Sequence, residues 1–188
     1  NNIDVAAARA RGVIVTNTPD VLTEEVADTC LGLVLMTVKE MPHSERWLRA
    51  GHWASKGAYP LTHTTLRCQK VGIFGLGRIG KAIAKRGEAF GLKIIYHSRT
   101  KQDVAYPYFD KLEDMARACD ILVVATPGGP QTNNLIDARI LDALGPDGIL
   151  INIARGTVVD EDALISALKE RRILTAGLDV FAKEPQVP

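Results

Sequence analysis

Residues 71–80 read VGIFGLGRIG, so an apolar run meets three glycines. Gly75, Gly77 and Gly80 have the G-x-G-x-x-G spacing, which allows a sharp turn, a close approach of the backbone to a pyrophosphate, and close packing of a helix on a strand. Free N–H groups at the N-terminus of the following helix would hold the phosphates. Because such spacings recur by chance, the surrounding pattern decides their meaning. The candidate cofactor-binding residues here are Gly75, Leu76, Gly77, Arg78, Ile79 and Gly80.

From Val71 onward, the pattern predicts strands and helices in alternation. Near-continuous apolar strands separated by helices are typical of a parallel sheet covered on both faces, and right-handed crossovers make such a sheet doubly wound. We therefore predict an α/β fold with a doubly wound parallel sheet of the Rossmann type. The predicted strands are residues 71–74, 93–96, 121–125, 149–153 and 174–178. The predicted helices are residues 79–90, 112–118 and 137–144, and a last helix that starts at residues 160–162. Phe90 is predicted on the inner face of the first of these helices, and Leu168 on the inner face of the last.

Ligands of such sheets lie beyond the carboxyl ends of the strands. The residues that directly follow the strands should therefore share one site. These are residues 75–79, 97–101, 126–127, 154–155 and Asp179.

The part of the chain before the glycine stretch predicts helices joined by irregular segments. Residues 3–11 form a short helical pattern, residues 13–15 resemble a strand, and residues 44–50 form another short helix. A longer helix over residues 23–40 would have Thr23 as its N-cap. Its apolar middle should be covered on more than one side, either by a subunit interface or by the core of a single chain.

Residues 51–69 are mostly irregular, and we expect them to form a surface or interface arm. The histidines in and near this arm share no helical or metal-ligand spacing, so no metal site is predicted. These histidines are His43, His52 and His63.

Composition points to a small-molecule partner. The 188 residues include 46% hydrophobic and 24% charged residues, which is ordinary for a globular protein with a substantial core. With a net charge of +1 and no basic run, the charge pattern does not indicate binding to nucleic acid or to a membrane surface. The longest apolar run, residues 30–38, is shorter than the ~20 residues of a membrane span.

The cysteines and the start of the chain indicate a cellular compartment. Cys30, Cys68 and Cys119 are odd in number and lack C-x-x-C spacing, so we interpret them as reduced, packed thiols. The first residues show no signal-peptide pattern. Both observations favour a cytoplasmic location.

The end of the second predicted strand bears on cofactor choice. It reads YHSRTK over residues 96–101, and the first carboxylate after it is Asp103. An acidic residue here would bind the ribose 2′-OH of NAD, whereas Ser98 and Arg99 could give a 2′-phosphate charge-assisted hydrogen bonds of about 1.5–3 kcal/mol each. The turn therefore favours NADP, with NAD and a solvated basic turn as alternatives. Ser98, Arg99 and Thr100 are the candidate cofactor-binding residues, with Tyr96 and His97 as candidate neighbours of the adenine.

Two later stretches carry a family resemblance. Residues 152–161 read NIARGTVVDE and residues 177–185 read GLDVFAKEP. Together with the glycine stretch, they closely resemble the D-2-hydroxyacid dehydrogenase family, and the turn at residues 98–100 looks most like its NADP-dependent glyoxylate/hydroxypyruvate reductase branch. The resemblance implies hydride transfer from NADPH to a small 2-keto acid, in a homodimer made through the cofactor domains.

The resemblance also implies roles for individual residues. Arg155 would hold the substrate carboxylate and polarise its keto oxygen, with a structural salt bridge as the alternative. Glu184 would hydrogen-bond a catalytic histidine and stabilise its protonated form. Asp179 would pair with the nicotinamide carboxamide, or else cap a helix or turn. Thr126 and Pro127 would wall the nicotinamide ribose, and Ala154 completes the candidate cofactor-binding residues.

The sequence departs from the family pattern at both ends. The general acid/base histidine of the family follows Glu184 at a position beyond Pro188, and no histidine here replaces it by motif. We therefore expect residues 1–19 to be the tail of a substrate domain and its linker, and residues 20–188 to be an NAD(P)-binding Rossmann domain. Such a piece should bind NADPH without turnover.

Two other functions are compatible with parts of this pattern. One is an NAD-dependent dehydrogenase of another D-2-hydroxy acid. The other is a dinucleotide-sensing, corepressor-like binding protein. Arg155 and Glu184 argue against the sensor, because a sensor needs only the contacts to the dinucleotide.

Overall fold

The computed structural model describes residues 3–18 and 20–188. Its centre is a five-stranded parallel sheet in the order β2-β1-β3-β4-β5, which confirms the predicted α/β, Rossmann-type architecture. The strand order reverses at β1, because the chain goes from β1 to β2 on one side and then to β3 on the other. The strands are β1 (Lys70–Phe74), β2 (Lys93–His97), β3 (Ile121–Val124), β4 (Ile149–Asn152) and β5 (Thr175–Leu178).

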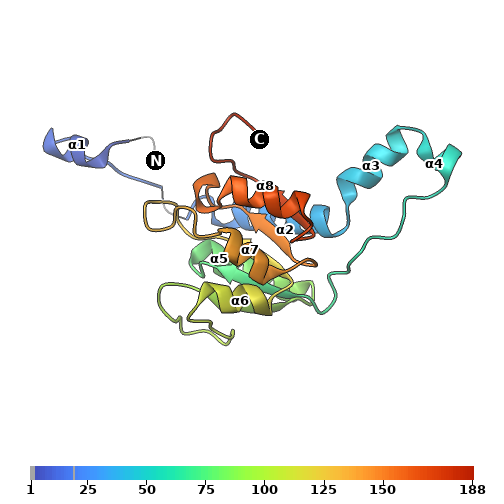
Figure 1. The fold of residues 1–188 in the computed structure, drawn as a ribbon. Coiled ribbons are helices and arrows are strands. Elements are labelled where there is room, and N and C mark those ends of the chain that lie inside the picture. The colour runs from blue at the N-terminus through green and yellow to red at the C-terminus, as the bar shows by residue number, and fades with distance from the viewer. Residues whose placement is uncertain (1–2, 19) are drawn as a thin grey trace.

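Helices cover both faces of the sheet (Figure 1). On one face, Ile73 and Ile94 pack with Cys30, Val34 and Ile83 of two long helices. On the other face, the strands pack against three shorter helices in a second apolar cluster. The first face carries α2 (Thr23–Val38) and α5 (Arg78–Ala89), and the second carries α6 (Leu112–Ala118), α7 (Ala138–Leu144) and α8 (Glu161–Lys169). The short 3₁₀ helix η1 (Gly156–Val158) follows β4.

Two segments extend away from the sheet on opposite sides (Figure 1). One carries α1 (Val5–Ala10), which has no buried residue. The other carries α3 (Met41–Arg49) and the arm at residues 51–69 with α4 (His52–Lys56), and neither helix has a buried residue. Pro19, at the predicted domain boundary, lies outside the described residues.

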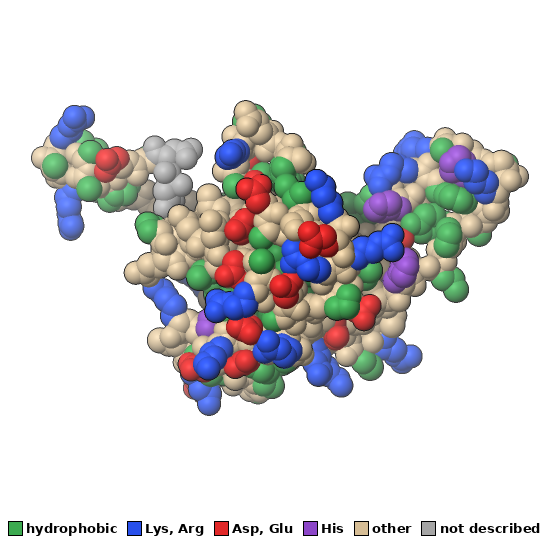
Figure 2. Space-filling view, viewed as in Figure 1, with side chains coloured by type: hydrophobic (Ala, Val, Ile, Leu, Met, Phe, Trp, Pro, Cys, Tyr) green, Lys and Arg blue, Asp and Glu red, His purple; other side chains and the backbone are tan. Residues whose placement is uncertain are grey.

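Charges of both signs are interspersed on the face shown in Figure 2, without a broad patch of one sign. Within the described ranges, no helix is long and apolar enough to cross a membrane.

Several backbone predictions were wrong in detail. Residues 13–15 pair with no strand among the described residues, and without a partner an extended segment is not a strand. Thr23 is already the first residue of α2, so Leu22 is the N-cap and no side chain caps the helix. At the other end, α2 stops at Val38, and Glu40 has a left-handed φ of 49°. The arm at residues 51–69 is mostly irregular, as predicted, and α4 is its one helix among the described residues.

Three side chains are more exposed than predicted. Phe90 follows the end of α5 and is 48% exposed, and Leu168, in the last turn of α8, is 37% exposed. Cys68 is exposed, whereas Cys30 and Cys119 are buried. Burial raises the pKa of both buried thiols to about 12, and the Asp179 carboxylate acts in the same direction on Cys30. Both buried thiols are therefore protonated and unreactive at neutral pH.

Candidate functional site

The glycine loop joins β1 to α5. At two of its glycines, neighbouring backbone atoms of the protein leave no room for a side chain. Gly75 has a φ of +103°, and a Cβ there would lie 2.7 Å from the amide nitrogen of Thr126. A Cβ on Gly80 would lie 2.2 Å from the carbonyl oxygen of Gly75. The first glycine therefore makes the turn, and the third lets α5 pack against the loop.

The middle glycine is different, because a Cβ on Gly77 would meet no atom of the described residues within 4 Å apart from its own neighbours in the chain. Gly77 has an ordinary φ of −78° and is the N-cap of α5, where no side chain accepts a hydrogen bond. The first N–H groups of a helix lack partners within that helix. Gly77 thus leaves open space beside amides for which the described residues supply no acceptor, and these residues fit the pyrophosphate of a dinucleotide.

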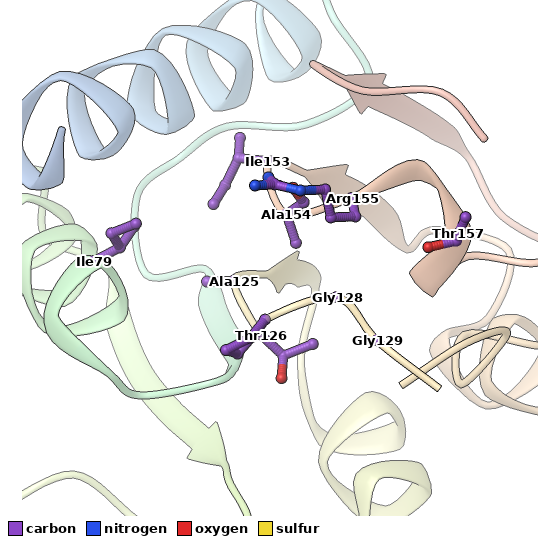
Figure 3. Close-up of a pocket in the computed structure, with 10 residues that line it drawn as sticks. Ile79, Ala125, Thr126, Gly128, Gly129, Ile153, Ala154, Arg155 and Thr157 are labelled. Carbon is purple, nitrogen blue, oxygen red and sulfur yellow. The ribbon is translucent and has the colours of Figure 1, made fainter. Parts of the chain in front are cut away.

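Two cavities lie beyond the carboxyl ends of β1, β3 and β4 and share Ile79, Ala125 and Pro127. The first, of about 300 Å³, lies at the glycine loop, and we call it the phosphate cavity. The second, of about 470 Å³, extends to Arg155, and we call it the arginine cavity. Because they share three lining residues, the two cavities adjoin, and we call the pair the groove from the glycine loop to Arg155. The arginine cavity is lined by Ile79, Ala125, Thr126, Pro127, Gly128, Gly129, Ile153, Ala154, Arg155 and Thr157 (Figure 3).

Arg155 reaches into the arginine cavity from the end of β4, with its guanidinium turned toward the Ile79 side (Figure 3). Its Nη1 donates to the carbonyl oxygen of Ala154 at 2.6 Å. A Cβ on Gly128 would lie 2.7 Å from Cγ of Arg155, so the bare glycine makes room for this side chain. Arg155 makes no ion pair among the described residues, so the salt-bridge alternative finds no support.

Asn152 is a positioning residue that the sequence reasoning missed. Its amide side chain is buried, at 1% exposure. Its Oδ1 accepts from the Ala154 amide at 3.0 Å, and its Nδ2 donates to the Arg155 carbonyl at 3.1 Å. Its own carbonyl accepts from the Asp179 amide at 3.0 Å. A polar residue inside the apolar run 149–153 was the signal that could have identified it.

Asp179 and Glu184 lie on the segment after β5, which runs close to η1. A Cβ on Gly156 would lie 1.9 Å from the carbonyl carbon of Phe181, so only glycine permits this approach. Oε1 of Glu184 accepts from the Phe181 amide at 2.9 Å. The Asp179 carboxylate accepts no hydrogen bond among the described residues, so the capping alternative finds no support either. Neither carboxylate lines the phosphate cavity or the arginine cavity.

The turn after β2 is the predicted site for the 2′-position of the ribose. Arg99 is exposed and makes no ion pair within the described residues, and the amides of residues 99–101 find no acceptor there. The Ser98 hydroxyl donates to the Thr100 carbonyl at 2.7 Å, so it must rotate before it can donate to a phosphate. Nδ1 of His97 donates to the Phe109 carbonyl at 2.9 Å.

The remaining candidates differ in which atoms face the groove. Thr126, Pro127, Ile79 and Ala154 line the arginine cavity. The Leu76 side chain is 2% exposed and belongs to the core, so only its backbone could reach a ligand. Arg78 lines the phosphate cavity, and its guanidinium pairs with Asp20 at 2.7 Å. Over residues 3–18 and 20–188, no three His, Cys, Asp or Glu side chains are grouped to hold a metal ion.

Comparison with known protein families places most of the chain in one family. Residues 31–188 match the family described as D-isomer specific 2-hydroxyacid dehydrogenase, NAD binding domain. A glyoxylate/hydroxypyruvate reductase A of Arabidopsis thaliana is 51% identical over the whole chain, and a hydroxyphenylpyruvate reductase of Plectranthus scutellarioides is 47% identical. The chain spans 60% of the length of each of these relatives.

Solved structures agree with this comparison. A crystal structure of the NADPH-dependent glyoxylate/hydroxypyruvate reductase of Sinorhizobium meliloti, in complex with NADP and malonate, superposes with a TM-score of 0.95 at 54% identity. The match covers 99% of this chain and 59% of that one. A protein from Thermus thermophilus superposes with a TM-score of 0.92 at 40% identity, and the match again covers 99% of this chain and 59% of that one.

Proposed function

The chain belongs to the D-isomer specific 2-hydroxyacid dehydrogenase family, and we propose that it is the cofactor-binding part of an NADPH-dependent reductase of small 2-keto acids of the glyoxylate or hydroxypyruvate type. One observation carries this proposal: two adjoining cavities reach from the open space beside Gly77 to Arg155, whose guanidinium makes no ion pair among the described residues. The first end suits a pyrophosphate and the second suits a carboxylate. The names of the relatives support the same substrate class.

The residues of the groove have separable tasks under this proposal. A bound NADPH would supply the hydride. Arg155 would bind the substrate carboxylate through its planar fork and stabilise the charge that grows on the keto oxygen. Ile79 and Ala125 give this end of the groove apolar walls that exclude water and strengthen these interactions.

Glu184 would act on an acid/base histidine supplied by the whole protein. One carboxylate oxygen is bonded to the Phe181 amide, which leaves Oε2 free to accept from an imidazolium. A carboxylate beside an imidazole favours the protonated form, which is the form that donates a proton.

The test of this function is a steady-state assay of the full-length protein with glyoxylate and hydroxypyruvate. We expect oxidation of NADPH that depends on the keto acid, and a higher kcat/KM with NADPH than with NADH. A protein that binds NADPH but oxidises it with neither keto acid would contradict the proposal and favour the sensor alternative. A preference for NADH would favour an NAD-dependent dehydrogenase.

Arg99→Ala tests the NADP preference. We expect the Kd for NADPH to rise about 10- to 100-fold, because a charge-assisted hydrogen bond of about 1.5–3 kcal/mol is lost. The Kd for NADH should stay within twofold, about the resolution of the measurement. Fluorescence titration measures both constants. Arg67→Ala is the matched control, since Arg67 is also exposed and makes no ion pair within the described residues. Unchanged NADPH binding in Arg99→Ala would show that the turn does not read the phosphate.

We also propose a homodimer formed through α2 and the arm. Leu48 of α3 and Trp53 of the arm are exposed, and α2 exposes Met36 beside a cavity of about 430 Å³. Glu40 anchors the arm, because it accepts a hydrogen bond from Tyr59 at 2.5 Å and pairs with His63 at 3.2 Å. These bonds hold the pKa of Glu40 below its usual range. Size-exclusion chromatography with light scattering on the full-length protein should give twice the subunit mass.

A further inference from the structure

The segment after β2 folds back on the strand that precedes it. The Tyr96 amide donates to the Pro107 carbonyl at 3.0 Å, and the Phe109 amide donates to the Tyr96 carbonyl at 2.9 Å. The ring centroids of Tyr96 and Tyr108 lie 5.3 Å apart. Residues 98–106 therefore form a closed loop whose two ends both meet at Tyr96.

The hydroxyl of Tyr96 reaches the middle of this loop. It accepts a hydrogen bond from the backbone amide of Gln102 at 2.8 Å and donates one to the backbone carbonyl of Gln102 at 3.2 Å. Tyr96 is fully buried, at 0% exposure, and packs in the cluster beneath α2 and α5. Its side chain therefore cannot be a neighbour of the adenine, as the sequence suggested, and its polar end serves the loop instead.

The side chain of Gln102 connects this hydrogen-bonded backbone to the turn at residues 98–100. Its side-chain nitrogen lies 3.3 Å from both the carbonyl and the hydroxyl of Thr100. At the other end of the turn, the His97 carbonyl accepts from the Gly75 amide at 2.9 Å, which fixes the end of β2 against the glycine loop. Arg99 lies between these two anchored points and makes no ion pair within the described residues.

We propose that Tyr96 is a positioning residue for cofactor selection: its buried hydroxyl closes the loop through Gln102 and holds the turn in the shape that presents Arg99 and the free amides of residues 99–101 to a 2′-phosphate. This inference rests on the proposed preference for NADPH. It adds that selectivity depends on a core side chain that touches no part of the ligand. A preorganised turn loses less conformational freedom when the phosphate binds.

The test compares the full-length wild type with Tyr96→Phe, which keeps the ring in the core and removes only the hydroxyl. We expect the Kd for NADPH to rise about 3- to 10-fold, the size of one or two net hydrogen bonds, and the Kd for NADH to stay within about twofold. Amide hydrogen exchange without cofactor should be protected at Gln102 in the wild type and faster in the variant. Tyr59→Phe removes a hydroxyl that bonds to Glu40 in the arm and should leave the ratio of the two Kd values unchanged.

The outcomes separate this inference from the proposed function. A purely structural tyrosine would lower the melting temperature and leave the ratio of the two Kd values unchanged, and that result would overturn the inference. The inference would also be overturned if, in the wild type, the backbone amide of Gln102 exchanged as fast as the backbone amide of Arg99. This measurement needs only the wild-type protein, so it tests the inference even if Tyr96→Phe does not fold. A wild type that binds NADH as tightly as NADPH would overturn the proposed cofactor preference and this inference with it.

Discussion

Gly80→Ala is expected to destabilise the fold and abolish dinucleotide binding, whereas Gly77→Ala is expected to weaken binding and leave stability unchanged. A Cβ on Gly80 would lie 2.2 Å from the Gly75 carbonyl oxygen, which is backbone and cannot rotate away. Overpacking of this kind costs about 1–3 kcal/mol or more, which corresponds to about 2–4 °C in melting temperature for each kcal/mol in a domain of this size. The shift of α5 also moves the N–H groups that would hold the pyrophosphate.

A Cβ on Gly77 meets open space among the described residues but would occupy the place proposed for the pyrophosphate. We expect the Kd for NADPH to rise about 10- to 100-fold, because the added methyl group would clash with the bound pyrophosphate and cost about 1–3 kcal/mol of binding free energy. Thermal unfolding and fluorescence titration of both variants measure the two effects. Gly32→Ala in α2 is the control, because its Cβ would also meet nothing within 4 Å and it lies far from the loop in sequence. Full NADPH affinity in Gly77→Ala would mean that the dinucleotide does not lie over this glycine.

Arg155→Ala in the full-length protein is expected to lower kcat/KM for the 2-keto acid by about 10²- to 10³-fold, the loss measured when a donor to a developing oxyanion is removed. The Kd for NADPH and the melting temperature should stay as in the wild type, because Arg155 is exposed and makes no ion pair among the described residues. Arg155→Lys should recover only part of the rate, since an ammonium cannot bind a carboxylate through two parallel hydrogen bonds.

Steady-state kinetics and cofactor titration together check the Arg155 prediction. Arg171→Ala is a suitable control, because Arg171 is exposed on the segment after α8 and also forms no ion pair within residues 3–18 and 20–188. If Arg155→Ala unfolded the protein or weakened NADPH binding to the same degree as turnover, Arg155 would be a structural residue and not a substrate-binding one.

The architecture could be read from the sequence because its signals are local. Each strand is a run of four or five mostly apolar residues, which predicts burial on both faces, and the glycine spacing at residues 75–80 marks the first crossover. The errors lie where local pattern and tertiary context compete. Residues 13–15 have strand-like composition but find no neighbouring strand among the described residues, and Phe90 and Leu168 continue an apolar pattern past the edge of the packed face.

The sequence by itself determined the parallel sheet, the glycine loop at the start of α5 and the order of the strand ends that carry the candidate residues. Only the tertiary structure decided that Gly77 faces open space while Gly75 and Gly80 face backbone, that Asn152 closes the turn before Arg155, and that the hydroxyl of Tyr96 holds Gln102. The physical reason is that an apolar run and a glycine spacing are patterns of residues that are neighbours along the chain. The space beside a glycine and the partner of a buried polar group depend instead on atoms that only folding brings together.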